Sequence, residues 1–311
     1  PAGTKRLSNL LRSQKWDYTE IQNFLFGKAM LLAQELRQKS RLLVIYDDSV
    51  VEKPESFHAE GLCAVASSKS KRLTRVKSGY YSPPIKGVVH VPGFQWTSAL
   101  LSTLGTAPQL LQMEWWTNRG DWASQGLQEK FNLFTKIAEH LPDAIHIFDR
   151  GYAGQPWLNI FFEHQAQFIL RWNSTYLLAD LHGNAKHAWQ LVAGKKIMAS
   201  KYIWDSQRKQ RRIVGMLYTE IRHPKFPNER LWLVVSKHGK GQTPWYIITN
   251  MPVLSNKDAW FIIHAYAKRW EIEQSFRTCK SELALESPRL KFWHNRMKIM
   301  HMVSLVYAFL L

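Results

Sequence analysis

The spacing of apolar positions predicts a helix and then a strand near the start of the chain. Residues 18–39 carry apolar side chains three or four residues apart, the spacing that gives a helix one apolar face. Residues 41–47 form a short apolar run, which is typical of a strand buried on both faces. The acidic pair Asp47 and Asp48 is expected to close this strand.

Further along, short apolar runs alternate with longer amphipathic stretches. We expect strands at 86–91, 108–115, 145–148 and 167–172, and helices at 122–140 and 154–165. Strands followed by alternating helices and strands are typical of an α/β domain.

The pattern changes after this region, because strand-like segments then dominate. Segments separated by turn residues lie at 201–205, 211–219, 231–236 and 245–249, and a long helix is expected at 256–285, with Ser255 or Asn256 as its cap. The chain therefore divides into a helical N-terminal segment (1–40), the first part of the main domain (41–173), a β-rich insertion (174–254), and the second part of the domain with the start of C-terminal helices (255–311).

Charge indicates the kind of partner. The 311 residues include 42 Lys and Arg but only 24 Asp and Glu, which gives a formal net charge of +18. Such a surplus is typical of proteins that bind the phosphates of nucleic acids. The basic stretches 69–77, 195–212 and 289–298 are candidates for contact with the DNA backbone. A solvated basic surface is the alternative for any single lysine.

Cysteine usage and hydropathy limit the compartment. Cys63 and Cys279 are far apart and fit neither a disulfide framework nor a cysteine-based zinc site. Residues 1–6 are polar and lack the apolar core of a signal peptide, and no apolar run reaches the ~18 residues of a membrane span. These features indicate a cytoplasmic protein without a membrane partner.

One stretch of the expected helix at 256–285 carries candidate chemistry. At about 100° per residue, one face of a continuous helix would present, within an arc of roughly 60°, Tyr266, Arg269, Glu273 and Lys280. A carboxylate can hold a metal ion while neighbouring cations and a phenol hold phosphate oxygens. The same spacing also fits an ordinary solvated helix face with an ion pair between Arg269 and Glu273.

Two aspartates add to this candidate site. Asp48 and Asp149 each follow an apolar, strand-like run, and strand ends are where ligands and catalytic groups gather in α/β sheets. Together with Glu273 they would form an oxygen-only site suited to two Mg²⁺ or Mn²⁺ ions. Each aspartate also fits an ordinary turn or capping residue.

Three motifs resemble one family. Residues 149–152 (Asp-Arg-Gly-Tyr) and 46–49 (Tyr-Asp-Asp-Ser) resemble the second- and first-aspartate motifs of the IS-four family of bacterial insertion-sequence transposases. The family's Tyr-Arg-Glu-Lys signature is similar to the spacing Tyr266-x2-Arg269-x3-Glu273-x6-Lys280. The resemblance covers roughly residues 40–285.

The resemblance implies an α/β fold of the RNase H-like type, in which a mixed sheet is flanked by helices and a β-rich insertion precedes the glutamate helix. It also implies an Asp-Asp-Glu transposase, an enzyme that cleaves DNA at transposon ends and joins the freed 3′ hydroxyl to target DNA. The implied partners are double-stranded DNA, as terminal inverted repeats and target, and a second copy of the chain in a homodimer.

The resemblance also implies roles for individual residues. The metal ligands for Mg²⁺ or Mn²⁺, with two ions expected, would be Asp48, Asp149 and Glu273. The residues that hold DNA would be Tyr266, Arg269, Lys280 and Arg150.

Two alternatives stay open. Neighbouring side chains on a strand point to opposite faces, so Asp47 and Asp48 cannot both reach one site. The family pattern favours Asp48, because Ser49 then takes the position of the small hydroxyl residue, and Asp47 is the alternative. The alternative functions are another RNase H-like nuclease, such as a resolvase, and a non-catalytic DNA-binding protein derived from a transposase.

Overall fold

A mixed β-sheet organises the chain in a computed structural model, which describes residues 2–53, 56, 58–67, 89–205, 210–239 and 242–310. Its twelve strands are β1 (Leu43–Glu52), β2 (Cys63–Ala66), β3 (His90–Ser102), β4 (Gln109–Trp116), β5 (Ile145–Phe148), β6 (Gln167–Trp172), β7 (Leu177–Ala179), β8 (Ala185–His187), β9 (Ala199–Asp205), β10 (Gln210–His223), β11 (Phe226–Lys237) and β12 (Trp245–Thr249). The described helices are α1 (Ala2–Arg12), α2 (Tyr18–Arg37), α3 (Gly126–His140), α4 (Gln155–Glu163), α5 (Ala188–Leu191), α6 (Asn256–Ala267), α7 (Trp270–Ser281) and α8 (Trp293–Leu310).

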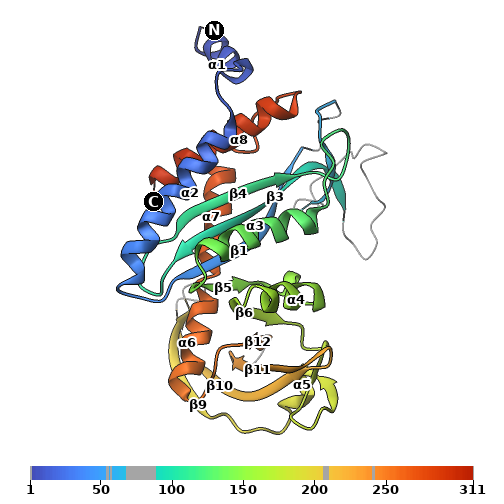
Figure 1. The fold of residues 1–311 in the computed structure, drawn as a ribbon, viewed down its shortest axis with the longest axis vertical. Helices are drawn as coiled ribbons and strands as arrows, with labels where there is room; N and C mark the ends of the chain where they lie inside the picture. The colour runs from blue at the N-terminus through green and yellow to red at the C-terminus, as the bar shows by residue number, and fades with distance from the viewer. Residues whose placement is uncertain are drawn as a thin grey trace.

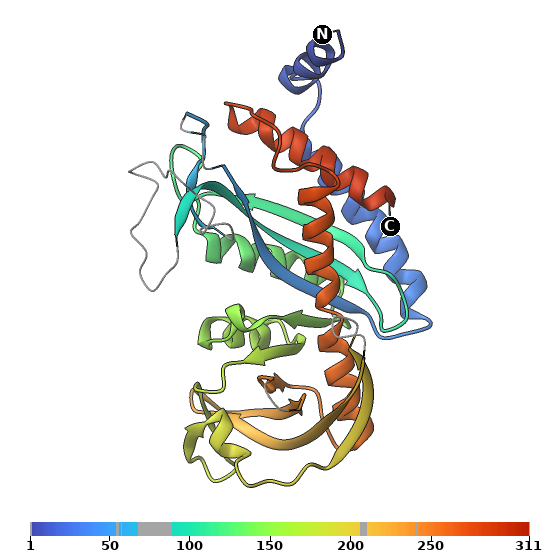
Figure 2. The same cartoon turned by 180° about the vertical axis from the view of Figure 1, so that it is seen from behind.

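The middle of the sheet has the strand order β4-β3-β1-β5-β6. β1, β5 and β6 run parallel, whereas β3 is antiparallel to β1 and β4 is antiparallel to β3. Helices flank this sheet on both faces: Figure 1 shows α3 in front of it, and Figure 2 shows α7 on the other side. The mixed sheet flanked by helices is consistent with an RNase H-like fold and confirms the fold class expected from the sequence.

Alternate residues of β1 enter two different cores. Leu43 and Ile45 pack in a cluster that contains apolar residues of α6, α7 and α8. Val44 and Tyr46 pack in a second cluster, with apolar residues of α3 and α4. Because side chains alternate along a strand, Asp47 faces the side of the sheet covered by α7, and Asp48 faces the side covered by α3.

The β-rich segment continues the main sheet. β12 pairs with β6, and β11 and β10 follow outward from it, while β9 pairs with β10. The strands expected at 201–205, 211–219, 231–236 and 245–249 each lie within one of these four strands and are confirmed. In Figure 1, α6 lies beside this part of the sheet, and it leads into α7 beside the middle strands.

The acidic pair does not end its strand, contrary to expectation. β1 continues past Asp47 and Asp48 to Glu52, and Asp48 lies opposite Thr97 in the register with β3. The long antiparallel partner supplies backbone hydrogen bonds along all of β1, so the strand extends through polar positions. The strand expected at 86–91 covers only the start of this partner, since β3 runs from His90 to Ser102. Residues 86–88 lie outside the described residues.

The long helix expected at 256–285 is also wrong, because the structure has two helices there. α6 begins at the expected cap, where the Ser255 hydroxyl accepts a hydrogen bond from the Asp258 amide. It ends at Ala267, and the amides of Arg269, Glu271 and Ile272 then bond three residues back, which tightens the chain before α7.

Parts of the basic stretches expected to contact DNA lie outside the residues that the structure describes. The basic stretch 69–77 lies outside the described residues, as do residues 206–209 of the stretch 195–212.

Among the described helices, none is long and apolar enough to cross a bilayer. Cys63 and Cys279 are both buried and unpaired.

Candidate active site

Four elements bring a group of charged side chains to one side of the sheet. Asp47 comes from the middle of β1, and Asp149 follows directly after β5, the parallel neighbour of β1. Arg269 lies in the turn between α6 and α7, and Glu273 lies in the first turn of α7. Two of these side chains therefore come from the sheet, and the other two come from the turn between α6 and α7 and from α7 itself.

Arg269 bridges the three carboxylates of this group. Its Nη1 donates to Asp47 Oδ2 at 2.8 Å, and its Nη2 donates to Glu273 Oε1. Its Nε lies 4.0 Å from Asp149 Oδ1. The guanidinium side chain is 12% exposed. One buried cation thus compensates for carboxylates from β1, the loop after β5 and α7.

Tyr266 completes the group from the last turn of α6. Its hydroxyl donates to Asp149 Oδ1 at 3.1 Å, and its ring packs against Trp245 of β12. Burial first, and then the charge of Asp149, raise the pKa of Tyr266 to about 12, while Arg269 and Arg171 of β6 oppose this. Tyr266 therefore stays a hydrogen-bond donor at neutral pH. Arg171 is a cation beside the site that the sequence motifs did not indicate.

The carboxyl group of Asp47 has a raised pKa. Burial raises the pKa of Asp47 to about 7, Arg269 opposes this, and the neighbouring carboxylates Asp149 and Asp48 add to the rise. The side chain is 18% exposed. Its ionised form is therefore costly unless cationic charge is close by.

Asp48 belongs to a different network on the other face of β1. Its Oδ1 accepts from the Thr97 hydroxyl at 2.7 Å and from the Tyr152 hydroxyl at 2.8 Å, and its Oδ2 accepts from Lys130 of α3. The structure therefore brings Asp47, and not Asp48, together with Asp149 and Glu273. The network around Asp48 joins β1 and β3 to Tyr152 in the turn that follows Asp149.

We expect Tyr152→Phe to loosen that turn. Tyr152 is 4% exposed, and its amide donates to the Asp149 carbonyl at 3.1 Å. Loss of the hydroxyl should lower the free energy of unfolding by about 1 kcal/mol. If Asp149 is a metal ligand, as the sequence motifs imply, loss of this outer partner should also weaken Mg²⁺ binding about 3–10-fold.

The matched control for Tyr152→Phe is Tyr46→Phe. Tyr46 lies on β1 and is buried, as Tyr152 is. Its hydroxyl lies 3.0 Å from His146 Nδ1, outside the Asp48 network. It should cost similar stability in urea unfolding without changing the Mg²⁺ dependence. An equal shift in Mg²⁺ dependence for both variants would show that Tyr152 does not orient Asp149 through this turn.

The remaining expected DNA-binding residues lie outside the Arg269 group. Lys280 lies two turns of α7 beyond Glu273, with its ammonium 5.4 Å from the centre of the Trp96 ring. Arg150 is exposed in the short turn Arg150–Tyr152, next to Asp149. The turn at Arg269 breaks the single helix face from which all four signature residues were expected to project.

The donor set suits a hard divalent cation. Asp47, Asp149 and Glu273 offer only oxygen ligands, which Mg²⁺ and Mn²⁺ prefer. In the described part of the chain, no group of three or more His, Cys, Asp or Glu side chains is close enough to hold a metal ion. Arg269 contacts Asp47 and Glu273 and lies 4.0 Å from Asp149, so it supplies positive charge in the place where these oxygen donors would hold a metal ion.

Comparison with known proteins identifies the family of the chain. No curated protein matches the chain. The family described as transposase DDE domain matches residues 126–309, which is more than half of the chain and includes Asp149, Tyr266, Arg269 and Glu273. The chain therefore belongs to the transposase DDE domain family.

Proposed function

We propose that this protein is an active DNA transposase of the IS-four type, which cleaves DNA at transposon ends and joins the freed ends to target DNA. The observation that supports the proposal most strongly is the convergence of Asp47, Asp149 and Glu273 on Arg269 in a chain of the DDE family. These three carboxylates come from β1, from the loop after β5 and from α7, as an Asp-Asp-Glu site requires. The formal net charge of +18 supports DNA as the substrate.

The carboxylates would hold Mg²⁺ or Mn²⁺, with two ions expected. When bound, such ions stabilise the charge on the attacking and leaving oxygens of a phosphodiester. We assign the first ligand to Asp47, because Asp48 faces the other side of β1 and accepts hydrogen bonds from Thr97 and Tyr152. Asp149 and Glu273 keep the roles that the sequence motifs imply.

Arg269 and Tyr266 would bind the DNA backbone in the working enzyme. Arg269 now contacts the carboxylates, and a metal ion that neutralises them would release its guanidinium for a phosphate oxygen. The Tyr266 hydroxyl is held as a donor beside Asp149 and can serve a phosphate in the same way. We also propose that Lys280 and Arg150 contact the DNA backbone, and that a homodimer pairs two DNA ends.

The test uses the full-length transposase and duplex DNA that carries its own terminal repeats. We expect strand-specific cleavage at the repeat ends with Mg²⁺ and none with chelator. Glu273→Gln removes one carboxylate charge without changing side-chain size and should lower the cleavage rate by at least about 10³-fold. Full activity of Glu273→Gln, or equal cleavage of branched DNA that lacks the repeats, would contradict the proposal.

A further inference from the structure

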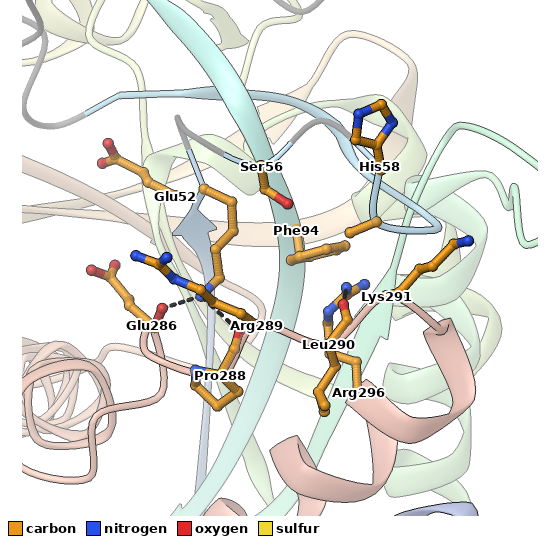
Figure 3. A pocket seen from close by; sticks show the side chains of 12 residues that line it. Glu52, Ser56, His58, Phe94, Glu286, Pro288, Arg289, Leu290, Lys291 and Arg296 are labelled. Carbon is orange, nitrogen blue, oxygen red and sulfur yellow. Dashed lines mark hydrogen bonds between the residues drawn. The ribbon is translucent and has the colours of Figure 1, made fainter.

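A second charged site lies at the far end of β1 from the carboxylates. It is a pocket of about 500 Å³ where the end of β1 and Phe94 of β3 meet the connection between α7 and α8, and it is also lined by Ser56, His58 and Ala59. Figure 3 shows Phe94 and Arg296 in its middle, with Arg289 on one side and Lys291 and His58 on the other. The lining of this pocket is rich in cations.

Two of these cations are held in place by backbone carbonyls. The Lys53 ammonium donates to the carbonyls of Glu286 and Pro288, the latter at 3.1 Å. The Arg296 guanidinium donates to the Glu60 carbonyl at 2.8 Å and lies 4.0 Å from the centre of the Phe94 ring. Carbonyl oxygens fix the position of a cation without cancelling its charge, and the carboxylates of Glu60 and Glu286 compensate in part for Arg296 and Lys53 respectively.

The cations of the pocket also lie close enough to disfavour one another. Burial first, and then the charge of Arg296, lower the pKa of Lys53 to about 8, and Arg289 acts in the same direction against Glu286. The carboxylate of Glu52 accepts from the Ser67 hydroxyl at 2.7 Å. Figure 3 shows the carboxylates of Glu52 and Glu286 on the side away from Phe94. An anion in the pocket would relieve this excess of positive charge.

The direction of β1 relates this pocket to the active site. Asp47 and Lys53 are six residues apart along β1 and its end. An extended chain rises about 3.3 Å per residue, so the two positions are roughly 20 Å apart. Along a B-form duplex this distance corresponds to about six base pairs. A separation of this size lies within the length of one DNA duplex.

We propose that this pocket binds one phosphodiester of the transposon-end duplex, about six base pairs from the bond that is cleaved. The proposal rests on the proposed function, because it takes DNA as the substrate. The ligand chemistry is a phosphate group held by Lys53, Arg289, Lys291 and Arg296. The pocket would fix the register of the duplex on the protein.

The test compares two double variants that remove the same charge. Arg289→Gln with Lys291→Gln removes two exposed cations from the pocket. Lys39→Gln with Lys225→Gln removes two exposed cations elsewhere and is the control. Substitution of exposed residues should leave the fold intact, and thermal unfolding checks this.

Two readouts use full-length protein and end DNA. In the pocket variant, the slope of log affinity against log salt should fall by about one, the value for one lost phosphate contact. Ethylation of single phosphates should interfere with binding of the wild type at about six base pairs from the cleaved bond, and this interference should disappear in the pocket variant only.

Two outcomes would overturn the proposal. One is that phosphate ethylation interferes with binding in the pocket variant as it does in the wild type, or that the interference disappears in the control variant as well. The other is a site for free phosphate alone, shown by inorganic phosphate that stabilises the wild type and not the pocket variant while end-DNA binding is the same in both. Either outcome leaves the proposed function intact, because that function is tested by cleavage of the repeat ends.

Discussion

Asp47→Asn is expected to abolish metal-dependent DNA cleavage, with a loss of at least about 10³-fold. Asp47 lies on the face of β1 that α7 covers, in contact with Arg269 and near Asp149. The amide removes one negative charge from the metal ligands while the side chain keeps its size. The cleavage rate at saturating DNA and Mg²⁺ measures this effect directly.

Asp48→Asn is the matched control, one residue along the same strand. Its Oδ1 accepts from both Thr97 and Tyr152, and an amide oxygen can accept from the same two hydroxyls. Only the ion pair with Lys130 is lost, and Asp48 is 37% exposed, so the cost in stability should be small. We expect cleavage within about tenfold of wild type. A larger loss of cleavage in Asp48→Asn than in Asp47→Asn would show that Asp48, and not Asp47, is the first metal ligand.

Arg269→Gln is expected to destabilise the metal-free protein strongly. It leaves Asp47, Asp149 and Glu273 close together without the cation that now compensates for them. Loss of one partner from a fully buried ion pair costs about 3–5 kcal/mol, and the partial exposure of Asp149 and Glu273 reduces this to about 2–3 kcal/mol. Because Mg²⁺ can replace the missing charge, it should stabilise the variant more than the wild type.

Urea unfolding with and without Mg²⁺ measures this difference. Lys268→Gln is the control, because it removes a partly buried ion pair with Glu271 one residue away from Arg269. Its loss of stability should not depend on Mg²⁺. If Mg²⁺ stabilised Arg269→Gln no more than the wild type, the three carboxylates would not form a metal site. DNA cleavage by Arg269→Gln should also stay low in saturating Mg²⁺, because the phosphate ligand is missing.

The apolar pattern predicted β4, β5, β6 and the first half of β1, but it missed most of β3 and did not decide between Asp47 and Asp48. Alternation along 41–47 places the two side chains on opposite faces. Which face holds the site depends on where α7 packs, and that is decided by long-range contacts of Leu43 and Ile45 with residues of α6, α7 and α8. A local pattern carries no information on such contacts, so the motif alone favoured Asp48.

The Tyr266–Lys280 segment shows a second limit of sequence reasoning. Its spacing indicated one site for Tyr266, Arg269 and Glu273. In the structure Tyr266 donates to Asp149, and Arg269 donates to Glu273, around one group of carboxylates. The turn that separates α6 from α7 was not visible, because Lys268 and Arg269 are ordinary helix formers. Lys268 donates to the Thr106 carbonyl, and Arg269 reaches Asp47 on β1, so tertiary contacts accompany the break.

Substitution of a single ligand by cysteine tests the central claim most directly, because a thiolate changes which metal the site accepts. Cys63 and Cys279 are buried, so a thiolate introduced at the site would be distinguishable from them. We predict that Asp47→Cys cleaves transposon-end DNA with Mn²⁺ but not with Mg²⁺, whereas Asp48→Cys shows the same metal preference as the wild type. A switch from Mg²⁺ to Mn²⁺ in Asp48→Cys, with Mg²⁺ activity retained in Asp47→Cys, would contradict the account.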